Sequence, residues 1–167
     1  CLDGHFIAEN PVKQIRDGHQ KNIAYMIGST GDDMLRVKLH RLARKYCSDQ
    51  ALQGKRSSFA WFFDRSVPGD NSGAWHSTDL WYWFGTMRDC WRPMTDQDKA
   101  LSELMLGYLT NFAKYGDPNG GGLPLWEAGR PTSRRVMRLD DGKPRMATVS
   151  SIALRLSAIA GAFKKIQ

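Results

Sequence analysis

The stretch "NIAYMIGSTGDDM", residues 22–34, decides the fold class of this chain. Residues 22–29 are mostly apolar and end in Gly-Ser, which predicts a buried β-strand. The acidic turn behind them leads into residues 34–46, which predict an amphipathic helix whose apolar face comprises Leu35, Leu39, Leu42 and Ala43. A strand, an acidic turn and a helix in this order indicate an α/β protein.

A second strand and a histidine loop follow. Residues 57–63, "SSFAWFF", predict the strand, and the Pro-Gly-Asp-Asn-Ser-Gly sequence behind it predicts a turn region. This turn leads into "GAWHSTDLWYWFG", residues 73–85, where His76 stands directly ahead of an aromatic-rich helix. Loops at the carboxyl ends of neighbouring parallel strands lie on the same edge of a sheet. We therefore expect His76 to lie near Asp32 and Asp33.

The second half of the chain predicts a long helix, an edge strand and a terminal helix. Thr95 and Asp98 match a capping box at the start of the long helix, and Gly116 is expected to end it. The sequence "RVMRL", residues 135–139, predicts an edge strand. Residues 150–165 predict a terminal helix that packs on the domain or, alternatively, lies on a membrane surface.

The length and composition indicate one soluble domain, or a large piece of one, over residues 1–167. Hydrophobic residues make up 41% of the chain, which is enough for a core, and no apolar run approaches the ~20 residues of a membrane span. The net charge of +7 is scattered and comes without a nucleic-acid-binding motif, so nucleic acid is not an expected partner. No signal-peptide pattern opens the sequence, and both a cytoplasmic and a secreted location stay open.

The three cysteines, Cys1, Cys47 and Cys90, match neither a disulfide framework nor a metal site, because their number is odd and none lie close in sequence. Reduced thiols are expected, with a Cys47–Cys90 bridge as the alternative.

His76 and the Asp32–Asp33 pair have the residue types of an acid–base site. A carboxylate that accepts a hydrogen bond from Nδ1 of a histidine fixes the tautomer that leaves Nε2 free as a base. Such a pair needs a nucleophile, and the sequence contains no G-x-S-x-G elbow. Taken alone, these residues also permit a structural interpretation, in which His76 is a half-buried polar group and the aspartates cap the next helix.

Four motifs in order resemble the C-terminal part of the type-B carboxylesterases, the family of para-nitrobenzyl esterase and the cholinesterases. These motifs are "LDGHFIAENP" (2–11), "IGSTGDD" (27–33), "GAWHSTDLWYWFG" (73–85) and "NFAKYGDPNGGGLPLW" (111–126). The resemblance spans about residues 2–140. It implies the late strands and flanking helices of an α/β-hydrolase fold, with the N-terminal portion of that fold absent.

The resemblance also implies roles for individual residues. The triad acid of the family, usually Glu, falls on Asp33, and its histidine falls on His76, while Asp32 is the alternative acid. Because Asp is one methylene shorter than Glu, the loop of the acid is expected to sit closer to His76. Asp79 matches an acidic position that caps a helix or pairs with a basic side chain. Three tryptophans either line a pocket or belong to a half-buried core: Trp75, Trp81 and Trp83.

The implied activity is hydrolysis of a small-molecule carboxylic ester by a serine hydrolase, without a metal or organic cofactor. In the family, the oxyanion-hole glycines and the G-x-S-x-G serine lie upstream of these motifs. A complementary N-terminal polypeptide is therefore the expected partner, and the chain alone is expected to be inactive. The alternatives are a non-catalytic cholinesterase-like interaction module and an inactive esterase fragment.

Overall fold

The chain forms a four-stranded mixed sheet with helices on both faces. The computed structural model describes residues 3–141, 143–150, 152 and 154. Its elements are, in order, α1 (Pro11–Arg16), β1 (Met26–Thr30), α2 (Arg36–Leu52), β2 (Phe59–Phe63), α3 (Leu80–Trp83), η1 (Met87–Asp89), α4 (Asp96–Tyr115), β3 (Arg135–Leu139) and β4 (Arg145–Thr148). The strand order is β1-β2-β3-β4; the first three strands are parallel, and β4 pairs antiparallel with β3.

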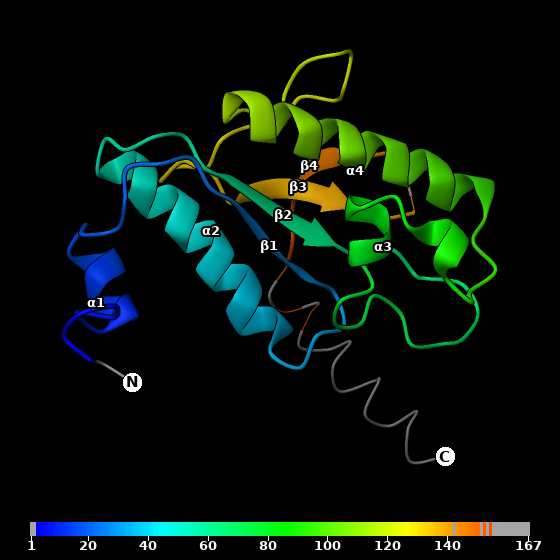
Figure 1. Cartoon of the computed structure of the whole chain (residues 1–167), viewed down its shortest axis with the longest axis horizontal. Helices are drawn as coiled ribbons and strands as arrows, with labels where there is room; N and C mark the ends of the chain where they lie inside the picture. The colour runs from blue at the N-terminus through cyan, green and yellow to red at the C-terminus, as the bar shows by residue number, and fades with distance from the viewer. Residues whose placement is uncertain (1–2, 142, 151, 153, 155–167) are drawn as a thin grey trace.

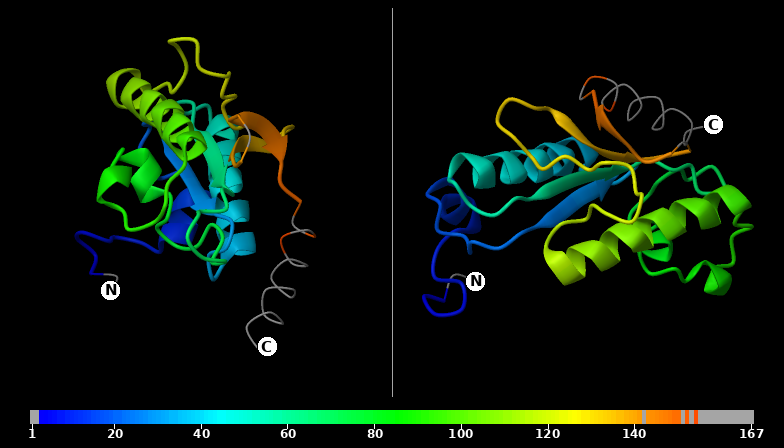
Figure 2. Two further views of the ribbon diagram at one scale, coloured as in Figure 1. Left: turned by 90° about the vertical axis from the view of Figure 1, so that its right-hand side faces the viewer. Right: turned by 90° about the horizontal axis from the view of Figure 1, so that it is seen from above.

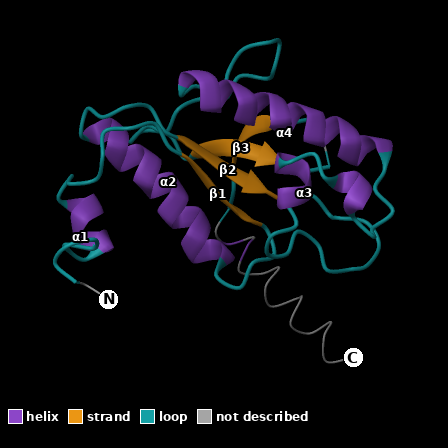
Figure 3. Cartoon of the chain, in the orientation of Figure 1, coloured by secondary structure: helices purple, strands orange, loops and turns teal. Residues whose placement is uncertain are grey.

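The molecule has three layers, with α2 on one face of the sheet and α3 and α4 on the other (Figures 1, 2 and 3). Side chains alternate along a strand, so the central strand β2 contributes to two cores. Ala60 and Phe62 pack with Cys47 of α2, whereas Phe59 and Phe63 pack with α3 and α4. This burial on both faces explains why the β2 sequence is apolar throughout.

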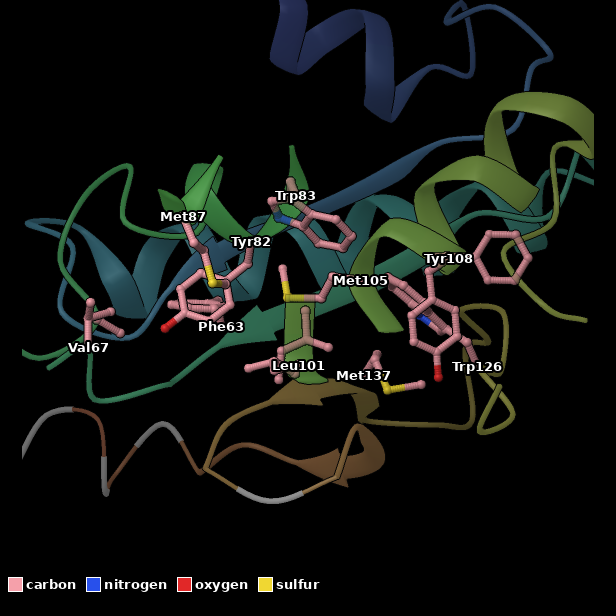
Figure 4. Close-up of a cluster of buried hydrophobic side chains, with 13 residues drawn as sticks. Phe63, Val67, Tyr82, Trp83, Met87, Leu101, Met105, Tyr108, Trp126 and Met137 are labelled. Carbon is pink, nitrogen blue, oxygen red and sulfur yellow. The ribbon is translucent and has the colours of Figure 1, made fainter. Parts of the chain in front are cut away.

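The larger core lies between the sheet and α4 (Figure 4). The ring centroids of Trp126 and Tyr108 lie 5.1 Å apart in an edge-to-face arrangement, and the same distance between Phe63 and Tyr82 is 4.9 Å. Nε1 of Trp126 donates a hydrogen bond to the carbonyl oxygen of Ala60 at 3.2 Å, so the buried indole keeps a polar partner. This core fastens α3, which directly follows the histidine loop, to β2.

The predicted long helix is confirmed as α4, with both of its predicted ends. The hydroxyl of Thr95 accepts a hydrogen bond from the backbone N–H of Asp98, whose carboxylate accepts one from the backbone N–H of Thr95 in return. Gly116 follows the helix with a φ of 71°, a left-handed conformation that glycine adopts at little cost.

Both strands predicted in the first half of the chain are present, but each begins later than predicted. The strand expected at 22–29 begins only at Met26, and the one expected at 57–63 begins at Phe59. The strand predicted at 135–139 is confirmed as β3 with the same bounds, but its predicted edge position was wrong, because β4 pairs along it and takes the edge of the described sheet. Strand β4 has only four residues, two of them polar, so its sequence alone does not predict a strand.

The helix predicted at 34–46 begins later and continues to Leu52 as α2. Of the predicted apolar face only Ala43 is buried, whereas Leu35 and Leu42 are exposed, so that part of the prediction was wrong. The buried face comprises Arg36, His40, Ala43, Cys47 and Gln50 and runs past the predicted end, because no breaker occurs before Gly54.

Three further features complete the comparison with the sequence. Helix α1 was not predicted, although Asn10 as N-cap and Pro11 at the first helical position are a recognisable start signal. Cys47 and Cys90 are both free, so the alternative of a bridge between them was wrong. The terminal helix predicted at 150–165 lies outside the described residues, apart from a few at its start.

Candidate active site

The two predicted loops meet at the carboxyl end of the parallel strands. Asp32 and Asp33 follow β1, and His76 lies in the loop that connects β2 to α3. Nδ1 of His76 lies 3.0 Å from Oδ2 of Asp33, across a sequence separation of 43 residues. Of the two neighbouring aspartates, it is therefore Asp33 that contacts the imidazole.

This contact shifts the pKa of both groups in opposite directions. The hydrogen bond and the negative charge of Asp33 raise the pKa of His76, and the same hydrogen bond lowers the pKa of Asp33. The side chain of His76 is 76% exposed and that of Asp33 is 13% exposed. In the tautomer that donates from Nδ1 to Asp33, Nε2 is unprotonated and lies on an exposed ring.

Asp32 joins the same two loops by a different set of bonds. Its Oδ2 accepts a hydrogen bond from the backbone N–H of Ala74 at 2.9 Å, and its own N–H donates to the carbonyl of Ala74 at 2.9 Å. Its Oδ1 accepts from Nη1 of Arg36 at 2.7 Å. A Cβ at Gly73, whose φ is 68°, would lie 2.2 Å from Oδ2 of Asp32, so this close approach requires glycine.

The structural alternative for the two aspartates was wrong, because neither side chain caps α2. The N-cap position is Leu35, which has no side-chain capping bond. The Oδ1 atom of Asp33 accepts from the backbone N–H of Met34 at 2.7 Å, and Asp32 faces the histidine loop. Each carboxylate thus joins the histidine loop to the start of α2: Asp32 also pairs with Arg36, and Asp33 also accepts from the backbone of Met34.

His76 lies in a tight turn formed by residues 75–78. The backbone N–H and the hydroxyl of Thr78 donate to the carbonyl of Trp75 at 3.3 and 2.8 Å. Ser77, between them, has a φ of 69°, the one positive φ at a non-glycine position in the described part of the chain. This conformation costs an L-residue roughly 1–2 kcal/mol, and such strain is concentrated at functional sites.

Asp79 has a role that the sequence did not predict. It stands at the N-cap position of α3 without a capping bond from its side chain. Its Oδ2 instead accepts a hydrogen bond from Nε1 of Trp83 at 3.1 Å. Burial raises the pKa of Asp79, although the Trp83 bond and the nearby His76 act in the opposite direction. The predicted capping and ion-pair roles were both wrong.

The three tryptophans of the loop and helix divide between core and surface. Trp83 is buried, and Trp81 is partly buried against the larger core. Trp75, next to His76, is exposed. The half-buried core interpretation is confirmed for Trp81 and Trp83.

The sequence predicted Asp98 only as part of the capping box of α4, and not the buried bonds that its carboxylate makes to Arg65 and Tyr82. This carboxylate accepts hydrogen bonds from Nε of Arg65 at 2.7 Å and from the hydroxyl of Tyr82 at 2.6 Å. Burial alone would raise its pKa, but the bonds from Arg65, Thr95 and Tyr82 together lower the pKa to about 2. Asp98 thereby ties the start of α4 to the end of β2 and to α3.

The described residues contain neither a metal-binding cluster nor a membrane-spanning helix. No group of three or more His, Cys, Asp or Glu side chains within 3–141 and the few described residues beyond is arranged to hold a metal ion. Over the same residues, every helix is too short or too polar to cross a membrane.

Known proteins provide an independent comparison. The model of the carboxylesterase family matches residues 43–152. Carboxylesterase 5A of Canis lupus familiaris is 50% identical over 46 residues, which are 28% of this chain and 8% of that protein. The bile salt-activated lipase of Mus musculus is 45% identical over 53 residues, which are 32% of this chain and 9% of that protein.

Several solved structures that resemble this chain are esterases. A PNB esterase superposes with a TM-score of 0.75 at 20% identity, over 93% of this chain and 42% of that chain. A carboxylesterase of Geobacillus stearothermophilus gives a TM-score of 0.70 at 17% identity, over 93% of this chain and 43% of that one. At this identity the likeness shows the fold, and the mixed sheet with its flanking helices is part of an α/β-hydrolase fold.

The lengths differ markedly between this chain and its relatives. The chain spans 8% of the first matched relative and 42% of the PNB esterase structure. The family match, in contrast, runs over residues 43–152, more than half of this chain. The chain belongs to the carboxylesterase family.

Proposed function

We propose that this chain supplies the acid–base pair of a serine carboxylesterase, with His76 as general base and acid and Asp33 as the residue that orients it. One observation carries the proposal: Nδ1 of His76 lies 3.0 Å from Oδ2 of Asp33 in a chain of the carboxylesterase family. Asp32, which is engaged by Ala74 and Arg36, is the weaker candidate for the acid.

The proposed reaction hydrolyses a small-molecule carboxylic ester in two steps. A serine hydroxyl attacks the ester carbonyl, and its proton passes to Nε2 of His76. The bond to the alcohol oxygen then breaks, and Nε2 returns the proton to that oxygen. Water attacks the resulting acyl-serine by the same proton route, which releases the carboxylic acid and restores the serine. In both steps the charge of Asp33 stabilises the imidazolium.

The nucleophile and the oxyanion donors are proposed to lie in a further, N-terminal polypeptide segment. The sequence contains no G-x-S-x-G motif, and the chain spans 42% of the PNB esterase on which it superposes. Residues 1–167 would then be the C-terminal part of one α/β-hydrolase domain. Strand β1 lies at an edge of the described sheet, where one side of its backbone can accept a strand of that segment.

The isolated chain is proposed to lack enzymatic turnover, because base and orienting acid without nucleophile and oxyanion hole lose several orders of magnitude in rate. Efficient hydrolysis of a nitrophenyl ester by the purified 167 residues would contradict this part of the proposal.

The main test labels activated serines in material isolated natively through a tag on this chain. A fluorophosphonate probe is added, and the intact mass of every co-purifying polypeptide is measured. We expect one adduct on a partner polypeptide, its loss in His76→Ala, and weaker labelling in Asp33→Asn. His19→Ala is the matched control, since His19 also pairs with a carboxylate, 2.7 Å from Glu9, but far from the strand ends.

The outcomes separate the candidate functions. Undiminished labelling in His76→Ala would refute the base role of this histidine. The absence of an adduct on every co-purifying chain would favour a non-catalytic interaction module or an inactive esterase fragment over the esterase.

A further inference from the structure

A buried arginine connects the loop that carries His76 to the segment ahead of α4. The side chain of Arg92 is 2% exposed. Its Nη1 and Nη2 atoms donate to the two carboxylate oxygens of Asp70 at 3.0 and 2.8 Å, and Nη1 also donates to the carbonyl of Pro68 at 2.8 Å. Both partners lie between β2 and His76, so Arg92 binds this loop through a side chain and through the backbone. Such a two-pronged pair is directional as well as strong.

Two indole rings lie against the guanidinium. Its central carbon lies 4.6 Å from the ring centroid of Trp91 and 6.0 Å from that of Trp81. Trp81 packs on the larger core, so Arg92 is anchored to the body of the domain. The aromatic faces attract the cation and restrict its position.

Asp70 transmits this anchorage along the loop. Its Oδ1 also accepts a hydrogen bond from the backbone N–H of Ser72 at 2.9 Å. The bonds from Arg92 and Ser72 lower the pKa of Asp70 to about 2, so the carboxylate stays ionised over the pH range in which His76 titrates. The next residue, Gly73, lies under Asp32, where the second anchor of the loop begins.

The loop needs an anchor on this side. Gly69 and Gly73 have φ values of 106° and 68°, and glycine has the largest choice of conformations in an unrestrained chain. Asp32 holds Ala74 from the side of β1. Its other side-chain bond goes to Arg36 of α2, and none of its bonds reaches the part of the histidine loop that precedes Gly73. On the other side, between β2 and Ser72, the bonds of Arg92 restrain the backbone.

We infer that Arg92 is a positioning residue for His76: by holding Pro68 and Asp70 it keeps the loop seated, so that the imidazole stays against Asp33. The inference rests on the proposed pairing of His76 with Asp33. It assigns a role in the acid–base site to an arginine that touches neither of the two residues.

The test measures the pKa of His76 by an NMR titration of its ring protons in the 167-residue chain. Asp33→Asn shows the full effect of losing the carboxylate. Arg92→Met, which keeps an apolar chain beside the indoles, is expected to lower the pKa of His76 by about half of that effect or more, because the bond between His76 and Asp33 is then only transiently formed. Arg92→Lys, with a point charge in place of the fork, should lower it less.

Arg88→Met is the matched control: Arg88 lies in η1, is 88% exposed, and pairs only with its neighbour Asp89 in the described structure. It should leave the pKa of His76 unchanged. The other carboxylate that faces His76, Asp79, is the same in every variant.

The results distinguish the inference from its premise. If Arg92→Met stays folded with the wild-type pKa at His76, while Asp33→Asn lowers it, Arg92 serves only stability and the inference is overturned. If Asp33→Asn itself leaves the pKa unchanged, the proposed pairing with His76 fails. If Arg92→Met does not fold, Asp70→Asn breaks the same pair from the loop side, and a wild-type pKa there overturns the inference equally.

Discussion

The buried histidine of α2 should make the protein lose stability between pH 6.5 and pH 4. His40 is 2% exposed, and its ring packs edge-on against Phe62 of β2 at a centroid distance of 5.3 Å. Its Nδ1 has no hydrogen-bond partner within the described structure. Burial, reinforced by the charges of Arg44 and Arg41, lowers the pKa of His40 from 6.5 to about 4.

The sign and size follow from proton linkage. Above pH 6.5 the histidine is neutral in both the folded and the unfolded state, so its contribution to stability is fully present. As the pH falls below 6.5, the unfolded state takes up a proton that the folded state takes up only near pH 4. One pKa unit corresponds to about 1.4 kcal/mol, so about 3 kcal/mol of the free energy of unfolding is lost across this window, and about 2.5 kcal/mol of it by pH 4.5.

Urea unfolding followed by tryptophan fluorescence at pH 7 and pH 4.5 measures this loss. In His40→Leu, which cannot titrate, the loss should be smaller by about 2.5 kcal/mol than in the wild type. Asp64 and Asp79, whose pKa values burial raises, act in the opposite direction and cancel in this comparison. His5→Gln, a change at an exposed histidine, is the control and should behave as the wild type. An equal loss in His40→Leu and the wild type would refute the reasoning.

Three other substitutions test the framework around the site. Asp98→Asn removes the buried charge partner of Arg65 and leaves it only the exposed Asp141, which should cost about 3–5 kcal/mol, seen as a fall of roughly 10 °C in Tm; a change below 2 °C would contradict a central role for this pair. Ser77→Val should be less stable than Ser77→Gly by about 1–2 kcal/mol in urea midpoints, since only glycine accepts the left-handed φ freely, and equal midpoints would argue against strain in the turn. Gly28→Ala should cost about 1–3 kcal/mol, because the new Cβ would lie 2.2 Å from the ring of Trp61, and a neutral result would mean that β1 and β2 can move apart there.

The elements with local signals were predictable from the sequence. The capping box of Thr95 and Asp98 and the glycine at 116 define α4 within a few residues of its ends, so the prediction of that helix was confirmed. Two predictions were wrong: the end of α2, whose buried face extends to Gln50, and the edge position of β3, because the short strand β4 that follows it in the chain was not predicted. Helix α1 was not predicted, although Asn10 and Pro11 are a local start signal for a helix.

By itself, the sequence determined that two chemically useful loops follow two parallel strands, because strand periodicity and turn chemistry are properties of adjacent residues. Only the tertiary structure decided how they meet. Asp32 and Asp33 are neighbours in sequence, yet one binds the backbone of Ala74 and the other lies against the ring of His76, over separations of 42 and 43 residues. The same holds for Arg92, whose partner Asp70 is 22 residues away. In these pairs one charge is largely buried, Asp33 or Arg92, and a buried charge must find its partner in space, which the sequence spacing does not specify.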